Sequence, residues 1–328
     1  MIQRSVFIQA LSPLHAGTGQ AVNSVVDLPI ARYRSTGIPF LPGSSIKGVL
    51  RDVLEERVPD TKERPLNLIC FGPKPDSEES EEPQEQKEKK RFAGAVVFND
   101  ARLLLLPVRS LRGTFAYVTS PLLLRLAQSD LAVTFPIPKL RRTPQGQGGQ
   151  PAQARAVVLP GSALLHGEYV YLEDIDCKIA KNPPEAELVE SVHKWGAWLA
   201  EQVFPDGERD LFSERFVVVD DETMTFLWET ATQVDARIRI NDKTHVVQEG
   251  ALWYEESLPA ESILVGLLAA DRPRRPGHDP LTAAILLDHV IGEGRKDLQF
   301  GGKATVGRGR AQMVPVRKLA NEARGGQP

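Results

Sequence analysis

Both ends of this chain carry an apolar strand pattern followed by a helix pattern. The stretch RSVFIQALSPLHAG alternates as a strand does before a glycine-bearing loop, and SIKGVLRDVLEER then places its apolar residues on one helical face. Near the other end, SILVGLLAA is typical of a buried strand and PLTAAILLDHVIGEG of a helix closed by glycine. This order favours an α+β fold and predicts a ferredoxin-like (modified RRM) core with inserted helical segments.

The middle of the chain supplies the predicted insertions. PEAELVESVHKWGAWLAEQVF has the spacing of an amphipathic helix, and RFVVVDD and MTFLWET flank a predicted turn. TQVDARIRIND and ALWYEESLP look like the arms of a β-hairpin, which places a hairpin over residues 234–259. We expect one domain over residues 1–328, with a disordered charged insert at 74–91 and a mobile basic loop at 139–155.

Composition excludes several classes of protein. Of 328 residues, 41% are hydrophobic and 25% charged, and no apolar run approaches the roughly 20 residues of a membrane helix. We therefore expect no membrane partner. The cysteines are Cys70 and Cys177 alone, which fits a reducing cytoplasm and excludes a cysteine-based zinc cluster. No G-x-x-x-x-G-K-[ST] motif is present, so nucleotide hydrolysis is unsupported.

The segment FGGKATVGRGR interleaves glycines with cations and contains no acid. Gly301 and Gly302 precede Lys303, and Arg308 lies between two further glycines. Glycine allows a backbone to approach a ligand closely, and cations beside it favour an anion such as a phosphodiester chain. A net charge of −3 shows that the molecule as a whole is not basic, so any basic groove is local. The alternative interpretation of this segment is a simple turn between two strands.

A second group of candidates follows the first predicted strand. Asp27 stands between an apolar stretch and Pro29, where it either caps a turn or places an acid beside a bound phosphodiester chain. His15 ends a strand; imidazole is suited to proton transfer, but a lone histidine is more often structural.

The predicted helix near residue 46 begins beside further candidates. Ser44 and Ser45 are candidate N-caps. Lys47 lies in the first turn, either as a solvated side chain or as part of a phosphate site at the helix N-terminus.

The predicted hairpin carries arginines at alternate positions. Arg237 and Arg239 alternate with isoleucines, so both arginines lie on one strand face. That face is either solvated or turned toward a bound phosphodiester chain, with apolar neighbours that wedge between its bases. Glu249, Glu255 and Glu256 follow in the second arm as candidate catalytic or metal-binding acids, and the sequence does not choose among them.

Taken in order, these segments resemble the RAMP superfamily of CRISPR RNA-binding proteins, and within it the backbone subunit of the type III-B (Cmr) effector. The matching pieces span residues 15–310: HAGTGQ with VVDLPIARYRSTGIPFLPGSSIKGVLR, FGP with AGAVVFNDARLLLLPVRSLRGTFAYVTSPLLL, RIRINDKTHVVQEGALWYEESLP, and GGKATVGRGR. The departures are the charged insert after FGP and the Gln/Gly-rich loop near residue 145. The ordered set is far more specific than any single motif.

The resemblance implies an RRM-like palm with the hairpin as a thumb. It implies that copies of the chain stack as a helical filament along a guide crRNA, with other Cmr subunits, and cut complementary single-stranded target RNA once per copy. The implied reaction is attack by the target's own 2′-hydroxyl, assisted by a divalent metal ion, Mg²⁺ or Mn²⁺.

The resemblance also places the cleaving aspartate on Asp27, as base or metal ligand. His15, Glu249 and Glu255 are further catalytic candidates. The predicted RNA-binding set consists of Ser44, Ser45, Lys47, Arg51, Arg237, Arg239, Gly301, Gly302, Lys303 and Arg308.

Two other functions remain open. The first is a non-catalytic RNA-binding subunit of a CRISPR complex, which would bind but not cut. The second is a standalone ribonuclease that processes guide precursors; it would need a His-rich or Tyr/Lys acid–base site, and the lone His15 argues against it.

Overall fold

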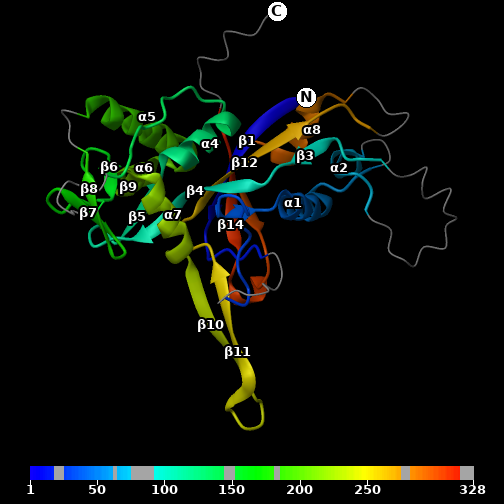
Figure 1. The fold of residues 1–328 in the computed structure, drawn as a ribbon. Coiled ribbons are helices and arrows are strands. Elements are labelled where there is room, and N and C mark those ends of the chain that lie inside the picture. The colour runs from blue at the N-terminus through cyan, green and yellow to red at the C-terminus, as the bar shows by residue number, and fades with distance from the viewer. Residues whose placement is uncertain are drawn as a thin grey trace, which may run out of the picture.

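One mixed sheet of twelve strands runs through the body of the molecule, and a two-stranded hairpin projects from it (Figure 1). The structure, a computed structural model, describes residues 1–17, 26–61, 65–74, 92–143, 152–180, 185–274 and 281–317. The strands are β1 (Ile2–Ala10), β2 (Phe40–Leu41), β3 (Val96–Phe98), β4 (Ala101–Arg109), β5 (Phe115–Thr119), β6 (Arg155–Val158), β7 (Tyr169–Leu172), β8 (Ile175–Ile179), β9 (Phe216–Val219), β10 (Gln233–Ile240), β11 (Val247–Ser257), β12 (Ile263–Ala270), β13 (Lys296–Gln299) and β14 (Arg310–Pro315). The helices are α1 (Gly43–Arg57), α2 (Leu66–Phe71), α4 (Pro121–Leu131), α5 (Ala186–Val203), α6 (Arg209–Arg215), α7 (Asp221–Thr230) and α8 (Ala283–Ile291), with 3-10 turns η1 (Asp206–Glu208) and η2 (Ala304–Val306).

The N-terminal strand β1 lies at the centre of one half of the sheet. It pairs antiparallel with β12 on one side and with β14 on the other. β12 in turn pairs antiparallel with β4 and β3. The strand order here is β14-β1-β12-β4, with α1 between β1 and β4 in the chain and α8 between β12 and β14. The segments at the two ends of the sequence therefore build one shared sheet, as their patterns predicted.

Both faces of this half of the sheet are covered. Val6 and Ile8 on β1 pack into one apolar cluster with side chains of α1 and α8, whereas Phe7 belongs to a second cluster with side chains of α4 and α5. Successive strand residues point to opposite faces, so a continuous apolar run is what a strand buried on both sides requires.

Strand β4 joins this half to the rest of the sheet. Its first residues pair with β12, and Leu106–Arg109 pair with β5 instead. From β5 the sheet continues through β9, β6, β8 and β7. The predicted amphipathic helix is α5, which buries Trp195 and Trp198 in the second apolar cluster, where Trp198 also meets Phe7 of β1. These tryptophans are core residues.

Two local expectations were wrong. Helix α1 begins at Gly43 with Pro42 as its N-cap, so neither Ser44 nor Ser45 caps it. The segment expected to follow a turn, residues 224–230, lies instead in helix α7, because the Asp220 side chain accepts a hydrogen bond from the Thr223 amide at 2.9 Å and caps a helix start.

The structure bears out the α+β class. Of the expected insert at 74–91, residues 75–91 lie outside the described residues, and so do residues 144–151 of the basic loop. No helix among the described segments is both long enough and apolar enough to cross a membrane.

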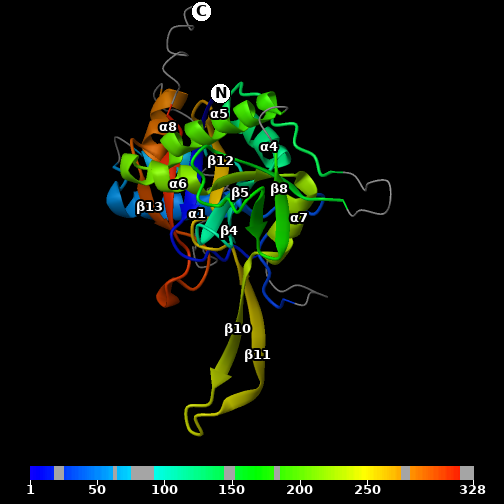
Figure 2. The same ribbon diagram turned by 90° about the vertical axis from the view of Figure 1, so that its left-hand side faces the viewer.

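The hairpin of β10 and β11 forms a sheet of its own and extends away from the body in both views (Figures 1 and 2). It pairs from Gln233↔Ser257 to Ile240↔Val247, with a register shift near its tip. β11 continues through Leu258, which bridges to Leu14 beside β1. The base of the hairpin is thus tied to the N-terminal segment, which contains His15 and Asp27.

Candidate functional site

Asp27 lies at the base of the hairpin. Its Oδ2 accepts a hydrogen bond from the backbone amide of Tyr254 on β11 at 2.7 Å. The adjacent Leu28 pairs with the same strand, through its amide to the Tyr254 carbonyl at 3.1 Å and through its carbonyl from the Glu256 amide at 3.0 Å. The residue is exposed, and the hydrogen bond fixes its carboxylate through one oxygen, while the other has no hydrogen-bond partner among the described residues.

His15 contacts the same strand two residues further along. Its Nδ1 lies 2.6 Å from the Glu256 carbonyl oxygen. A carbonyl only accepts hydrogen bonds, so Nδ1 carries the proton and Nε2 of the neutral ring is the acceptor. The backbone of the glycine-rich segment packs here too: a Cβ at Gly301 would overlap the His15 carbonyl, and the Gly309 amide donates to the Pro13 carbonyl at 2.9 Å. Gly301 is therefore required by a close approach within the protein.

Glu256 holds the Asp27 segment from inside the hairpin base. It is only 6% exposed. Its carboxylate accepts from the Ile30 amide at 3.0 Å, from Arg32 at 2.5 Å and from the Thr232 hydroxyl at 2.8 Å. A buried carboxylate that accepts from three donors is fully satisfied, so Glu256 acts as an anchor.

Glu255 pairs with cations of two different segments. It is 4% exposed, and its carboxylate forms ion pairs with Lys303 and with Arg237, the latter at 3.3 Å, and accepts from the Trp253 indole at 2.6 Å. Burial, together with Arg237 and Arg308, lowers the pKa of Lys303.

Asp235 forms the neighbouring pair with Arg308 at 2.6 Å. Burial opposes ionisation of Asp235, but hydrogen bonds from Arg308 and Gln233 outweigh it and lower the pKa of this carboxyl. The predicted RNA-binding cations Arg237, Lys303 and Arg308 are thus all paired with acids of the hairpin base.

The start of α1 presents a different arrangement. The Gly43 amide donates to Asp100 at 2.8 Å, so this helix terminus already has an anionic partner. Lys47 is half-buried and forms no ion pair with the described residues; burial, and to a lesser degree Arg51, lowers its pKa. Arg51 donates to the Gly72 carbonyl at 2.7 Å and lies over the Phe71 ring, which ties α1 to the FGP motif.

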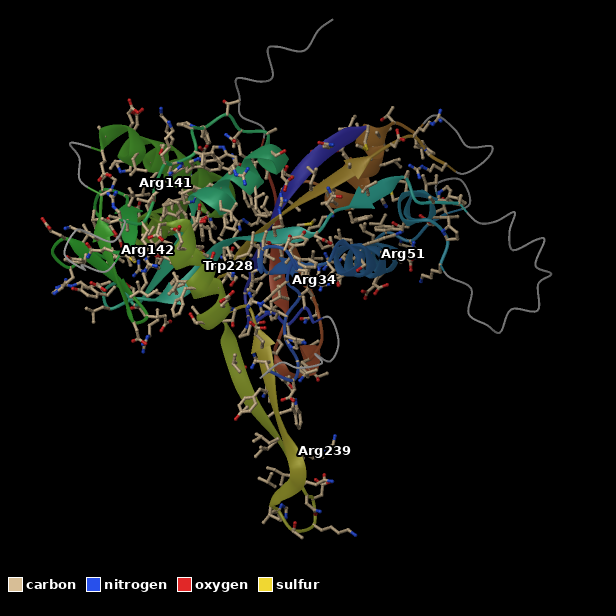
Figure 3. All side chains as sticks on the ribbon, in the orientation of Figure 1. Arg34, Arg51, Arg141, Arg142, Trp228 and Arg239 are labelled. Atoms are coloured by element: carbon tan, nitrogen blue, oxygen red, sulfur yellow. The ribbon has the colours of Figure 1, made fainter. Side chains whose placement is uncertain are left out.

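The two faces of the hairpin differ in character. Val234, Ala236 and Ile238 share one face with Leu252 and Tyr254; Ile238 is 50% and Leu252 55% exposed. Arg237 lies on the opposite face across from Trp253, and Arg239 is exposed farther out (Figure 3). The side chain of Glu249 lies outside the described part of the chain.

A protein-only metal site is not found in the part of the chain that the structure describes. No three acidic, histidine or cysteine side chains gather there. Cys70 and Cys177 are buried and unbonded to each other, and burial raises the pKa of each thiol to about 12.

The structure therefore brings His15, Asp27, Glu255, Arg237, Lys303 and Arg308 to the base of the hairpin and leaves Ser44, Ser45, Lys47 and Arg51 on α1. Sequence reasoning missed the anchoring role of Glu256. It also missed the ion pair of Asp235 with Arg308 and the hydrogen bond from the Gly43 amide to Asp100. Alternation along β10 and β11 carried part of that signal, since it sets Asp235 opposite Glu255.

Two named proteins are similar in sequence to this chain over nearly its whole length. The chain is 35% identical over 323 residues to a protein of Pyrococcus furiosus named CRISPR system Cmr endoribonuclease Cmr4, which covers 96% of each sequence. It is 23% identical to the CRISPR system CMR subunit Cmr4 of Saccharolobus solfataricus, over 94% of both.

Solved structures show the same fold. The crystal structure of oligomeric Cmr4 from Pyrococcus furiosus matches with a TM-score of 0.66 at 26% identity, over 97% of this chain and 99% of that one. A chain of the type III-B Cmr-beta complex bound to cognate target RNA matches with a TM-score of 0.65 at 20% identity, over 96% and 97% of the two chains. The profile of the RAMP superfamily matches residues 7–312. This chain belongs to the RAMP superfamily.

Proposed function

We propose that this protein is the backbone endoribonuclease subunit of a type III-B CRISPR effector, which binds guide crRNA and cuts complementary target RNA. The observation that carries the proposal is the exposed Asp27 carboxylate, held at the base of a projecting hairpin by the Tyr254 amide. The 35% identity to a Cmr endoribonuclease over nearly the whole chain supports the reaction type.

In the proposed reaction, the target's 2′-hydroxyl oxygen attacks the adjacent phosphorus and the 5′-oxygen of the next nucleotide leaves. The products are a 2′,3′-cyclic phosphate and a 5′-hydroxyl end. The second oxygen of Asp27 accepts the 2′-hydroxyl proton, and the departing 5′-oxygen takes a proton from water. Because Asp27 is anchored to β11, the hairpin that orients the RNA also fixes the position of the general base. Alignment of the 2′-hydroxyl with the phosphorus and with this carboxylate contributes much of the rate.

The apolar face of the hairpin would support that alignment. Ile238, Leu252 and Tyr254 offer exposed apolar surface on an element that projects from the body. Inserted between two bases, such side chains unstack them and turn the intervening ribose out of helical geometry. An unstacked nucleotide is free to bring its 2′-hydroxyl in line with the phosphorus.

A divalent ion, Mg²⁺ or Mn²⁺, fits this site only if the protein and the RNA phosphate coordinate it together. Among the described residues Asp27 supplies one free carboxylate oxygen, and Glu255 and Glu256 are occupied by cations and amides. Mg²⁺ is commonly held by one or two carboxylates together with substrate phosphates. In this alternative role the same Asp27 oxygen would hold the ion instead of taking the proton, and the ion would neutralise charge that develops on the phosphate.

We also propose that the core is ferredoxin-like. The order β14-β1-β12-β4, antiparallel throughout, with α1 and α8 as the two crossover helices, supports a β-α-β-β-α-β core. The second half of the sheet and the hairpin are then insertions in this single palm. Head-to-tail contacts between copies would extend the assembly along the guide.

The test is reconstitution of the complex from this chain, guide crRNA and the other Cmr subunits, with labelled complementary RNA. We expect several cuts at a constant spacing, one per copy, and none in non-complementary RNA. A complex that binds the target and leaves it intact would establish the non-catalytic alternative. Cutting of guide precursors by the isolated chain would establish the standalone ribonuclease.

A further inference from the structure

The turn at residues 33–37 carries an arginine that the predicted site does not include. The Gly37 amide donates to the Tyr33 carbonyl at 2.8 Å, and Arg32 and Pro39 bridge below the turn. Arg34 is exposed at this turn. Figure 3 shows it in the body of the molecule, between the labelled Trp228 and Arg51, with Arg239 farther out on the hairpin.

The turn is held rigid from below. Arg32 donates to the Gly37 carbonyl at 3.1 Å and to the Trp228 carbonyl at 2.8 Å, while it is paired with Glu256. The Tyr33 ring stacks on Phe40, and its hydroxyl donates to Asp100 at 3.1 Å. A side chain on a fixed backbone loses less conformational freedom on binding.

The cations at the base of the hairpin are already paired with acids. Arg32, Arg237, Lys303 and Arg308 all form ion pairs with carboxylates of the hairpin. Arg34 has no such partner among the described residues, so its full charge and its planar fork of donors remain available. That fork matches the two oxygens of a phosphate.

We propose that Arg34 binds a backbone phosphate of the RNA, an assignment that rests on the proposed function. Arg34 follows Asp27 by seven residues. The segment between them forms β-bridges to other parts of the same chain at Leu28, Ile30 and Arg32. At about 3.3 Å per extended residue, the two side chains are on the order of 20 Å apart along the segment. Arg34 therefore grips the RNA away from the scissile phosphate and contributes to binding more than to chemistry.

The experiment compares complexes assembled with R34Q, R34K and R125Q. Arg125 is an exposed arginine on α4, at the end of the body away from the hairpin, and serves as the matched control. Guide binding and target binding are titrated separately over a range of salt concentrations, and single-turnover cleavage is measured against RNA concentration. For one lost phosphate contact, we expect R34Q to lower the slope of log affinity against log salt by about 0.7 in one of the two titrations.

We also expect R34Q to raise the half-saturating RNA concentration several-fold, with a smaller change in the maximal cleavage rate. R34K restores the slope, and R125Q matches wild type. Salt slopes of R34Q equal to those of R125Q in both titrations would overturn the assignment, and so would a loss confined to the maximal rate. If the wild-type complex fails to bind or cut RNA, the proposed function fails instead, so the two failures are distinct.

Discussion

Two regions of this molecule look alike in sequence and differ in the availability of their charge. The glycine-rich segment 300–310 and the stretch from Arg34 to Arg51 both combine glycines with cations. In the first, Lys303 and Arg308 are paired with Glu255 and Asp235. In the second, Arg34 and Lys47 form no ion pair with the described residues.

The difference teaches that a cation in a glycine-rich segment is not by itself a phosphate ligand. Releasing Lys303 to bind RNA would leave the nearly buried Glu255 with one fewer partner, and an uncompensated buried charge is costly. Arg34 and Lys47 break no such contact when they bind a phosphate. We therefore propose that segment 300–310 has a joining role within the protein and that the region around α1 has an RNA-gripping role.

The strongest test of this division concerns Asp27, which is joined to the hairpin base. We expect D27N to lower target cleavage by about 10²- to 10⁴-fold, because asparagine cannot accept the 2′-hydroxyl proton. Guide and target affinities should stay near wild type, since asparagine still accepts from the Tyr254 amide. Single-turnover cleavage and binding titrations on the same assembled complexes measure both. Near wild-type cutting would remove Asp27 from the mechanism.

The joining role of the first region is tested by E255Q. We expect a loss of roughly 1.5–3 kcal/mol in the free energy of unfolding of the full chain, because Lys303 and Arg237 lose a buried counter-charge. Denaturant unfolding measures the loss. E190Q is the control, since its pair with Lys194 on α5 is exposed to solvent and such pairs contribute little to stability. A loss no larger than that of the control would mean that these cations are not committed to the fold.

The gripping role of the second region is tested by K47A. We expect weaker guide binding for every guide sequence and a decrease of about 0.7 in the slope of log affinity against log salt. The same titration on E190Q complexes supplies the baseline. An unchanged slope would identify Lys47 as a solvated side chain. The proposed RNA-gripping role of this region would then depend on Arg34 alone.

The smallest expected effect is on pH dependence at the hairpin base. The pKa of Asp235 is lowered from its ordinary 3.8, so the folded state binds a proton here less readily than the unfolded state does. The stabilisation is complete above that ordinary value and is lost as the pH falls through the folded pKa. D235N should remove this portion of acid sensitivity, within about 1 kcal/mol. The measurement is the free energy of unfolding of wild type and D235N at steps of about one pH unit between pH 5 and pH 2. Parallel curves of this free energy against pH would contradict the pairing with Arg308.

Much of the fold was readable because its elements carry strong periodicity. The continuous apolar run of β1 and the helical spacing of α5 predicted the correct elements. Helix α7 was missed because its start depends on the single capping residue Asp220, while its short apolar stretch has no clear period. The start of α1 was misplaced because the anion at its terminus is Asp100, which is distant in sequence.

The sequence by itself determined the superfamily, the α+β class, the two-faced hairpin and the candidate acid Asp27, because each depends on local order or on motifs in series. Only the tertiary structure decided which charges are free. Ion pairs such as Lys303 with Glu255 join residues 48 positions apart, and Arg32 with Glu256 joins residues 224 apart. Pairing at that separation is set by how the strands fold onto one another, and a charge acts on a ligand only when no neighbour within the protein has already neutralised it.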